Sequence, residues 1–123
     1  MSQKIVLVTG SYKGIGKDIV RQIAAHDKNY TVILTSRQDD QALNTISELK
    51  KQHQLTNVIS HQLDLEDDAS IEKLISWVSD KFGRLDTLVN NAGYLYGSLE
   101  LTTGFNKKVR SFVTQHLFSF FQF

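Results

Sequence analysis

Cysteine is absent from the 123-residue sequence, which excludes disulfide bonds, a thiol nucleophile and thiolate metal sites. A marked excess of one charge is also missing, because 14 Lys and Arg stand against 13 Asp and Glu, a formal net charge of +1. Nothing in this balance indicates a nucleic-acid partner. The four histidines, His26, His53, His61 and His116, show no metal-ligand spacing, so no metal site is expected.

Long hydrophobic runs are missing as well. The apolar run at residues 5–8 is too short for a signal peptide, and no segment approaches the length of a membrane span. We therefore expect no membrane partner and, by default, a cytoplasmic location. With 41% hydrophobic and 22% charged residues, the chain is predicted to be one soluble unit with one core.

Residues 4–16, KIVLVTGSYKGIG, combine this apolar run with a glycine-rich turn. A short run of Ile, Val and Leu predicts a strand buried on both faces, as in a parallel sheet. Gly10, Gly14 and Gly16 let the backbone turn tightly and approach a ligand closely. The helix that follows, from about Asp18, presents free N–H groups and the positive end of its dipole to a phosphate. Strand, turn and helix together predict a nucleotide site.

Two other phosphate-binding turns do not fit these residues. In the P-loop pattern G-x-x-x-x-G-K-[ST] the glycines are five positions apart and a hydroxyl residue follows the Lys. Here Gly10 and Gly16 are six positions apart, and Asp18 follows Lys17. The dinucleotide pattern G-x-G-x-x-G also differs from the spacing here, which is G-x-x-x-G-x-G.

Further β-rich runs at 30–35, 58–61 and 87–90 alternate with helical patterns after Gly16, within 39–54 and from about 69 to 82. Ser70 or Asp68 is expected to cap the last of these helices. The order β-α-β-α-β-α-β predicts an α/β fold with a parallel, doubly wound sheet and right-handed crossovers. Ligands of such sheets lie beyond the carboxyl ends of the strands, so the residues there are the candidates.

The sequence QLDL (62–65) follows the third strand, and NNAG (90–93) ends the fourth. With T-G-x-x-x-G-x-G at 9–16, these motifs resemble the short-chain dehydrogenase/reductase family, and most of all its carbonyl-reductase-like branch. The resemblance covers residues 4–98, the N-terminal, cofactor-binding half of that family. It implies a Rossmann-type sheet, which we expect to be truncated after about four strands.

The resemblance also implies residue roles. Asp64 would hydrogen-bond the adenine amino group, Asn90 would tie neighbouring strands together, and the small Ala92 and Gly93 would let the chain pass close to the adenosine ribose. Taken singly, Asp64 is equally explained as a helix-capping acid and residues 90–93 as a turn.

The charge at the end of the second strand favours NADP(H) as the cofactor. A site that prefers NAD commonly has an acid there for the ribose 2′-hydroxyl, whereas a 2′-phosphate needs cations. Here Arg37 follows the strand, the first acid is Asp39, and Lys13 lies in the glycine turn. The alternative is that both cations are ordinary surface residues. The residues expected to bind the cofactor are Gly10, Lys13, Gly14, Ile15, Gly16, Arg37, Asp64, Leu65, Asn91, Ala92 and Gly93.

The family's Tyr-x-x-x-Lys, in which the Tyr is the general acid, does not occur in this sequence. The four tyrosines are followed four positions later by Gly16, Leu34, Ser98 and Glu100. We expect the chain to stop before that motif, and we assign no catalytic residue.

Residues 104–123 are predicted to form a divergent tail after a half-domain of residues 1–103. Apolar residues at helical spacing, opposed by Lys and Arg, predict a C-terminal amphipathic helix that packs on the sheet. A membrane-surface helix or exposed apolar surface are the alternatives. The apolar positions are Phe105, Val109, Phe112, Val113, Leu117 and Phe120.

Three functions are consistent with these residues. In the first, the chain is the cofactor-binding portion of an NADP(H)-dependent carbonyl reductase, and it binds a small carbonyl substrate only when the missing half of the protein is supplied. Alternatively it is a non-catalytic NADP(H)-binding module that self-associates or pairs with a full-length relative. A third hypothesis is an inactive truncated product. The sequence does not identify the substrate.

Overall fold

The computed structural model describes residues 3–91 and 119–122 of the chain. All strands in this part run parallel in one sheet of order β3-β2-β1-β4-β5, and helices connect the first four of them. The predicted doubly wound, Rossmann-type sheet is therefore confirmed. The elements are β1 (Lys4–Val8), α1 (Gly14–His26), β2 (Tyr30–Ser36), α2 (Asp39–His53), β3 (Val58–Gln62), α3 (Asp68–Phe82), β4 (Thr87–Asn90) and β5 (Ser119–Gln122).

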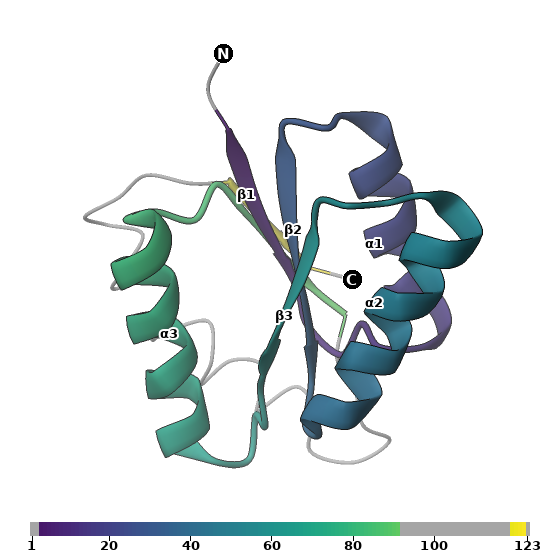
Figure 1. The fold of residues 1–123 in the computed structure, drawn as a ribbon. Helices are drawn as coiled ribbons and strands as arrows, with labels where there is room; N and C mark the ends of the chain where they lie inside the picture. The colour runs from purple at the N-terminus through teal and green to yellow at the C-terminus, as the bar shows by residue number, and fades with distance from the viewer. Residues whose placement is uncertain (1–2, 92–118, 123) are drawn as a thin grey trace.

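The sheet separates two layers of helices. Helices α1 and α2 cover one face, and α3 covers the other (Figure 1). Residues of β1 alternate between the two faces: Ile5 and Leu7 pack in the cluster that includes α3, whereas Val6 and Val8 pack in the cluster under α1 and α2. Burial on both sides explains why this strand is a continuous apolar run rather than an alternating one.

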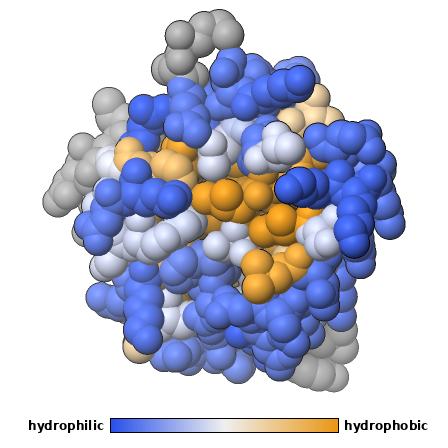
Figure 2. Space-filling view, viewed as in Figure 1, coloured by the Kyte–Doolittle hydropathy of each residue, from blue (hydrophilic) through white to orange (hydrophobic). Residues whose placement is uncertain are grey.

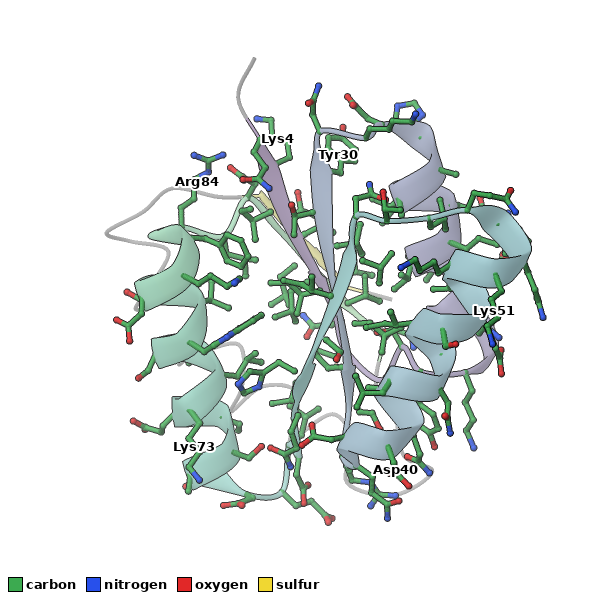
Figure 3. The ribbon with its side chains drawn as sticks, viewed as in Figure 1. Lys4, Tyr30, Asp40, Lys51, Lys73 and Arg84 are labelled. Carbon is green, nitrogen blue, oxygen red and sulfur yellow. The ribbon has the colours of Figure 1, made fainter. Side chains whose placement is uncertain are left out.

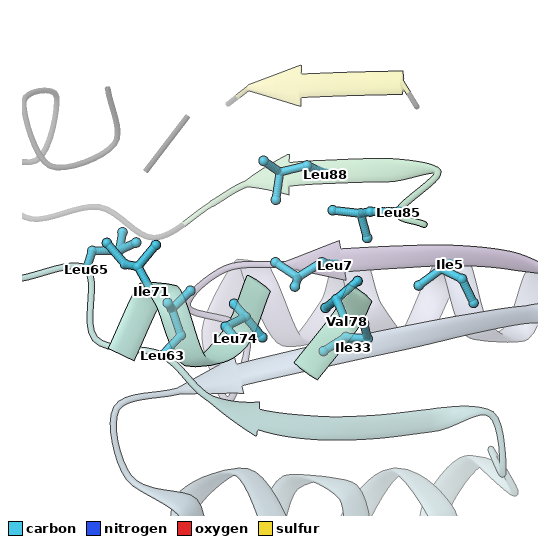
Figure 4. Packing of buried hydrophobic residues seen from close by; sticks show 10 residues of the cluster. All are labelled: Ile5, Leu7, Ile33, Leu63, Leu65, Ile71, Leu74, Val78, Leu85 and Leu88. Atoms are coloured by element: carbon cyan, nitrogen blue, oxygen red, sulfur yellow. The ribbon is translucent and has the colours of Figure 1, made fainter. Parts of the chain in front are cut away.

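The cluster under α3 draws on segments that are far apart in the sequence (Figure 4). Its members include leucines from the loop after β3 and from the loop before β4, so both loops are packed into this core. Its buried members are Ile5, Leu7, Ile33, Leu63, Leu65, Ile71, Leu74, Val78, Leu85 and Leu88.

The N-cap of α3 differs from the prediction of Ser70 or Asp68. Asp67 is the capping residue, and its carboxylate accepts a hydrogen bond from the Ala69 N–H at 3.0 Å. Asp68 is the first residue of the helix. Ser70 is the third residue of the helix, and its hydroxyl is bonded to Gln62 and to the backbone of Asp64.

The C-terminal tail, residues 104–123, also differs in part from the predicted helix. Residues 119–122, which include Phe120 of the expected helix, form strand β5, which pairs in parallel with β4 in the register Leu88 to Phe120. The backbone groups along the edge of β4 bond to a neighbouring strand, and aromatic residues favour strands, so a sheet position competes with the helix here. The rest of the expected helix, and with it Ala92 and Gly93, lies outside the described residues.

Strand β3 is the outermost strand on the side of the sheet away from β5. Figure 2 shows a small apolar area in the middle of this side, bordered by hydrophilic surface. Ile59 of β3 is partly buried against the core beneath α3. No helix within the described ranges is long and apolar enough to cross a membrane.

Candidate functional site

The candidate site lies along the edge of the sheet where the strands end and the helices begin. In Figure 3, Asp40 and Lys73, near the first turns of α2 and α3, mark this edge, while Lys4, Tyr30 and Arg84 mark the opposite one. The chain leaves β1 for β2 and β3 on one side and returns to β4 on the other. Strand order therefore reverses beside β1, which is where such sheets bind ligands.

The three glycines of the turn meet two different requirements. Gly10 and Gly14 have φ angles of 59° and 62°, in the left-handed region that glycine adopts without strain. Gly16 is needed for space: a Cβ there would lie 2.4 Å from Asn91 Nδ2 and 2.7 Å from the Gly10 carbonyl oxygen. Glycine at these positions lets the turn fold back on itself and lets α1 begin directly against it.

Hydrogen bonds from β2 hold one side of the glycine turn. Thr35 Oγ1 accepts from the Gly10 N–H at 3.1 Å, and the Thr35 carbonyl accepts from the Ser11 N–H at 3.1 Å. Ser11 Oγ in turn accepts from the Thr35 N–H at 3.0 Å and donates to the Val8 carbonyl at 2.7 Å. Both hydroxyl residues are buried, so the turn is fixed to the strand beside it.

Asn91, directly after β4, holds the other side of the turn. Its Nδ2 donates to the carbonyl oxygens of Thr9 and Gly10 at 3.2 Å each, and its backbone N–H donates to Thr9 Oγ1 at 3.0 Å. Asn90 is buried at the end of the strand. Asn91, the second asparagine of the pair, thus ties the end of β4 to the glycine turn, and the strand tie suggested for Asn90 stays a prediction.

Helix α2 supports the turn from its far side. Thr45 Oγ1 donates to the Tyr12 carbonyl at 2.5 Å, and Lys17 of α1 forms an ion pair with Glu48. Thr45 is buried. The turn is therefore held by β2, β4 and α2 before any ligand binds, which is the preorganisation that tight binding requires.

The first turn of α1 is open for an anion. Its N-cap residue, Lys13, makes no side-chain capping bond, and the first turn contains no acidic residue. The N–H groups there lack intrahelical partners and carry the positive end of the helix dipole. Asp18, the nearest acid on the helix, bonds to Arg21 at 2.7 Å and to Gln22 at 2.6 Å, and these bonds lower the pKa of its carboxyl.

Both candidate cations of the cofactor site are exposed. The Lys13 ammonium lies 5.3 Å from the centre of the Tyr12 ring, within cation–π distance. Arg37 directly follows β2, and its carbonyl accepts from Gln62 Nε2 at 3.3 Å. The last residue of β2 is Ser36, so a carboxylate does not occupy the end of this strand.

Asp64 lies in the loop between β3 and α3. Its Oδ1 accepts from the Glu66 N–H at 3.0 Å, which makes a local turn, and the helix cap is Asp67 instead. The Leu65 side chain is buried in the core, so Leu65 faces a ligand only through its backbone. Ile15, in contrast, is 76% exposed beside the turn, where an apolar side chain can cover a ligand.

The structure thus joins Gly10, Gly16 and Asn91 directly and places the Arg37 and Asp64 loops on neighbouring strand ends. Sequence reasoning missed the supporting hydroxyls, of which Thr35 and Thr45 are the main ones. A Thr at the end of a buried strand was an available signal for Thr35. Across the described ranges, no group of three or more His, Asp or Glu side chains is placed to hold a metal ion.

The fold and the glycine turn define a Rossmann-type α/β protein. The chain belongs to the short-chain dehydrogenase family, because the family model described as short chain dehydrogenase matches residues 4–123.

Individual relatives agree with this assignment. (+)-Neomenthol dehydrogenase of Capsicum annuum is 44% identical over 94 residues, which cover 75% of this chain and 29% of the relative. Carbonyl reductase [NADPH] 1 of Bos taurus is 36% identical over 101 residues, or 82% of this chain and 35% of the relative. The solved menthone neomenthol reductase of Mentha piperita superposes with a TM-score of 0.70 at 36% identity, covering 91% of this chain and 40% of that one. The chain thus spans about a third of the curated relatives it matches.

Proposed function

We propose that this chain is the cofactor-binding portion of an NADP(H)-dependent oxidoreductase that acts on carbonyl or alcohol substrates. The observation that carries the proposal is the glycine turn, which three elements hold in place against an open helix N-terminus. A dinucleotide's pyrophosphate suits this arrangement because backbone N–H groups and the helix dipole favour an anion there. The names of the relatives point to the same chemistry: one is a carbonyl reductase [NADPH] and another a menthone neomenthol reductase.

The preference for NADP(H) over NAD(H) is proposed from charge. Arg37 is exposed at the end of β2, next to Ser36 rather than an acid, and Lys13 is exposed in the turn. A planar guanidinium suits a phosphate with two parallel hydrogen bonds, and an ammonium adds a point charge. A 2′-phosphate placed between these groups would gain contacts that a 2′-hydroxyl does not make.

Arg37→Ala is expected to weaken NADPH binding by about 1.5–3 kcal/mol, or roughly 10- to 150-fold, and to change NADH binding much less. Calorimetric titration of both cofactors into the wild type and the variant measures this. Lys51→Ala, which removes one positive charge from the far end of α2, is the matched control and should leave both affinities nearly unchanged. Equal affinities of the wild type for NADPH and NADH would contradict the proposed preference.

Asn91→Ala is expected to lower both the stability of the chain and its affinity for NADPH. The variant loses two part-buried bonds to carbonyl groups, which costs about 1–3 kcal/mol, and loosens the glycine turn. Asn57→Ala is the control, since the Asn57 amide bonds the carbonyls of Ala24, Asp27 and Tyr30 at the opposite edge. Urea unfolding should show comparable losses for both variants, whereas only Asn91→Ala should weaken NADPH. Equal NADPH affinities of the two variants would argue against a site at this turn.

A second candidate is a non-catalytic NADP(H)-binding or association module. In this candidate the 123 residues, which contain no Tyr-x-x-x-Lys, hold the cofactor without a proton donor of their own. Both candidates bind the cofactor, and they differ in whether this chain, or an assembly that contains it, turns over a carbonyl substrate.

A further inference from the structure

A continuous chain of hydrogen bonds joins the two loops proposed to hold the adenosine part of the cofactor. The Asp64 N–H donates to Ser70 Oγ at 2.8 Å, and Ser70 Oγ donates to Gln62 Oε1 at 2.6 Å. Gln62 Nε2 then donates to the Arg37 carbonyl at 3.3 Å. This series of hydrogen bonds runs from the β3–α3 loop through the first turn of α3 and the end of β3 to the residue after β2.

The direction of these bonds follows from the groups themselves. A serine hydroxyl has one proton, and because Ser70 Oγ accepts from a backbone N–H, it gives that proton to Gln62 Oε1. The amide of Gln62 is thereby oriented, and its NH₂ group points toward the Arg37 carbonyl, which only accepts. Each group therefore fixes the orientation of the next.

Burial makes the middle of this chain costly to disrupt. Ser70 is only 3% exposed, so removing its hydroxyl leaves the Asp64 N–H and Gln62 Oε1 without their partner. The Ser36 carbonyl accepts from the Leu63 N–H at 2.8 Å, which adds a backbone tie between the same two strand ends. The side-chain bonds extend this tie outward, to the backbone of Arg37 and of Asp64.

We propose that Gln62 and Ser70 are positioning residues that set the spacing of Arg37 and Asp64 and thereby strengthen selection for the 2′-phosphate. This inference rests on the proposed function, in which Arg37 reads the phosphate and Asp64 reads the adenine. Neither Gln62 nor Ser70 needs to touch the cofactor. A ligand that engages both loops feels a change in their spacing more than a ligand that engages only one.

The test uses two probes, 2′,5′-ADP and 5′-AMP, which differ only in the 2′-phosphate and lack the nicotinamide half. Ser70→Ala and Gln62→Met, made in the full 123-residue chain, should each lower the ratio of the two affinities about three- to tenfold. The double variant should lower the ratio no further than the larger single effect, because both changes break one chain of bonds. Val78→Ala, a core change on α3 away from these loops, is the control for lost stability and should leave the ratio unchanged.

Three results overturn the inference: an unchanged ratio in both single variants, additive losses in the double variant, or an equal loss in Val78→Ala. Gln62 lies at a half-buried strand end, so Gln62→Met tests the same link even where Ser70→Ala does not fold. A wild-type chain that binds both probes equally would instead refute the NADP(H) preference of the proposed function, and the inference with it. Discrimination that persists in every variant refutes the positioning role alone.

Discussion

Gly16→Ala is expected to abolish measurable NADPH binding. The added Cβ would lie 2.4 Å from Asn91 Nδ2, 2.7 Å from the Gly10 carbonyl and 2.8 Å from the Ser11 Cα, and two of these neighbours are backbone atoms. The turn must therefore move away from α1, at a cost of about 1–3 kcal/mol in folding. The displaced turn can no longer make two charge-assisted hydrogen bonds to the phosphate, which together are worth on the order of 3–6 kcal/mol, roughly 100-fold or more in affinity.

Gly83→Ala is the matched control for this change. Gly83 has a φ of 72° at the end of α3, and a Cβ there meets no atom within 4 Å. The substitution should cost about 1–2 kcal/mol of stability through backbone strain alone and leave NADPH affinity intact. Titration calorimetry, with urea unfolding to measure stability, separates the two effects. A Gly16→Ala protein that binds NADPH as tightly as the wild type would show that the turn is not the phosphate site.

The second expectation is that the 123-residue chain, purified alone, binds NADPH but does not reduce carbonyl compounds. A bound cofactor supplies the hydride, but the developing alkoxide also needs a proton, and general acid catalysis contributes about 10²–10⁴-fold in rate. The Tyr-x-x-x-Lys pair that supplies it in the family is absent from this sequence. We therefore expect NADPH oxidation at the rate of the cofactor alone.

Oxidation of NADPH, followed by its absorbance with an aldehyde or a quinone added, tests this expectation. The bovine carbonyl reductase serves as the positive control, and Gly16→Ala as the variant without a cofactor site. Carbonyl-dependent oxidation by the wild type that disappears in Gly16→Ala would reveal a proton donor among these residues.

The fold was predictable because its signals are local. The apolar run at residues 5–8 is long enough for a strand and too short for a helix, and burial in two clusters requires that pattern. Gly10 and Gly14 were likewise found from the turn spacing, and both have positive φ. In such cases the residue type and the local backbone agree.

Contacts across the sheet were not predictable in the same way. Gly16 needs its small size because of Asn91, which reaches it only through the strand order that places β4 beside β1. Asp67, Asp68 and Ser70 are all acceptable capping residues by type, so residue type alone does not show that the helix begins at Asp68 and leaves Asp67 as its cap. Phe120 fits a helical pattern, yet the edge of β4 pairs with it as a strand.

The central claim is that NADPH binds at the edge of the sheet formed by the glycine turn and the ends of β2, β3 and β4. Amide chemical shifts in an NMR titration of the chain with NADPH test it most directly. We expect the largest shifts at residues 10–16, 35–37, 64–65 and 91, and small shifts at the opposite edge, around Asn57 and Arg84. No saturable shifts, or shifts centred on Asn57 and Arg84, would contradict the account.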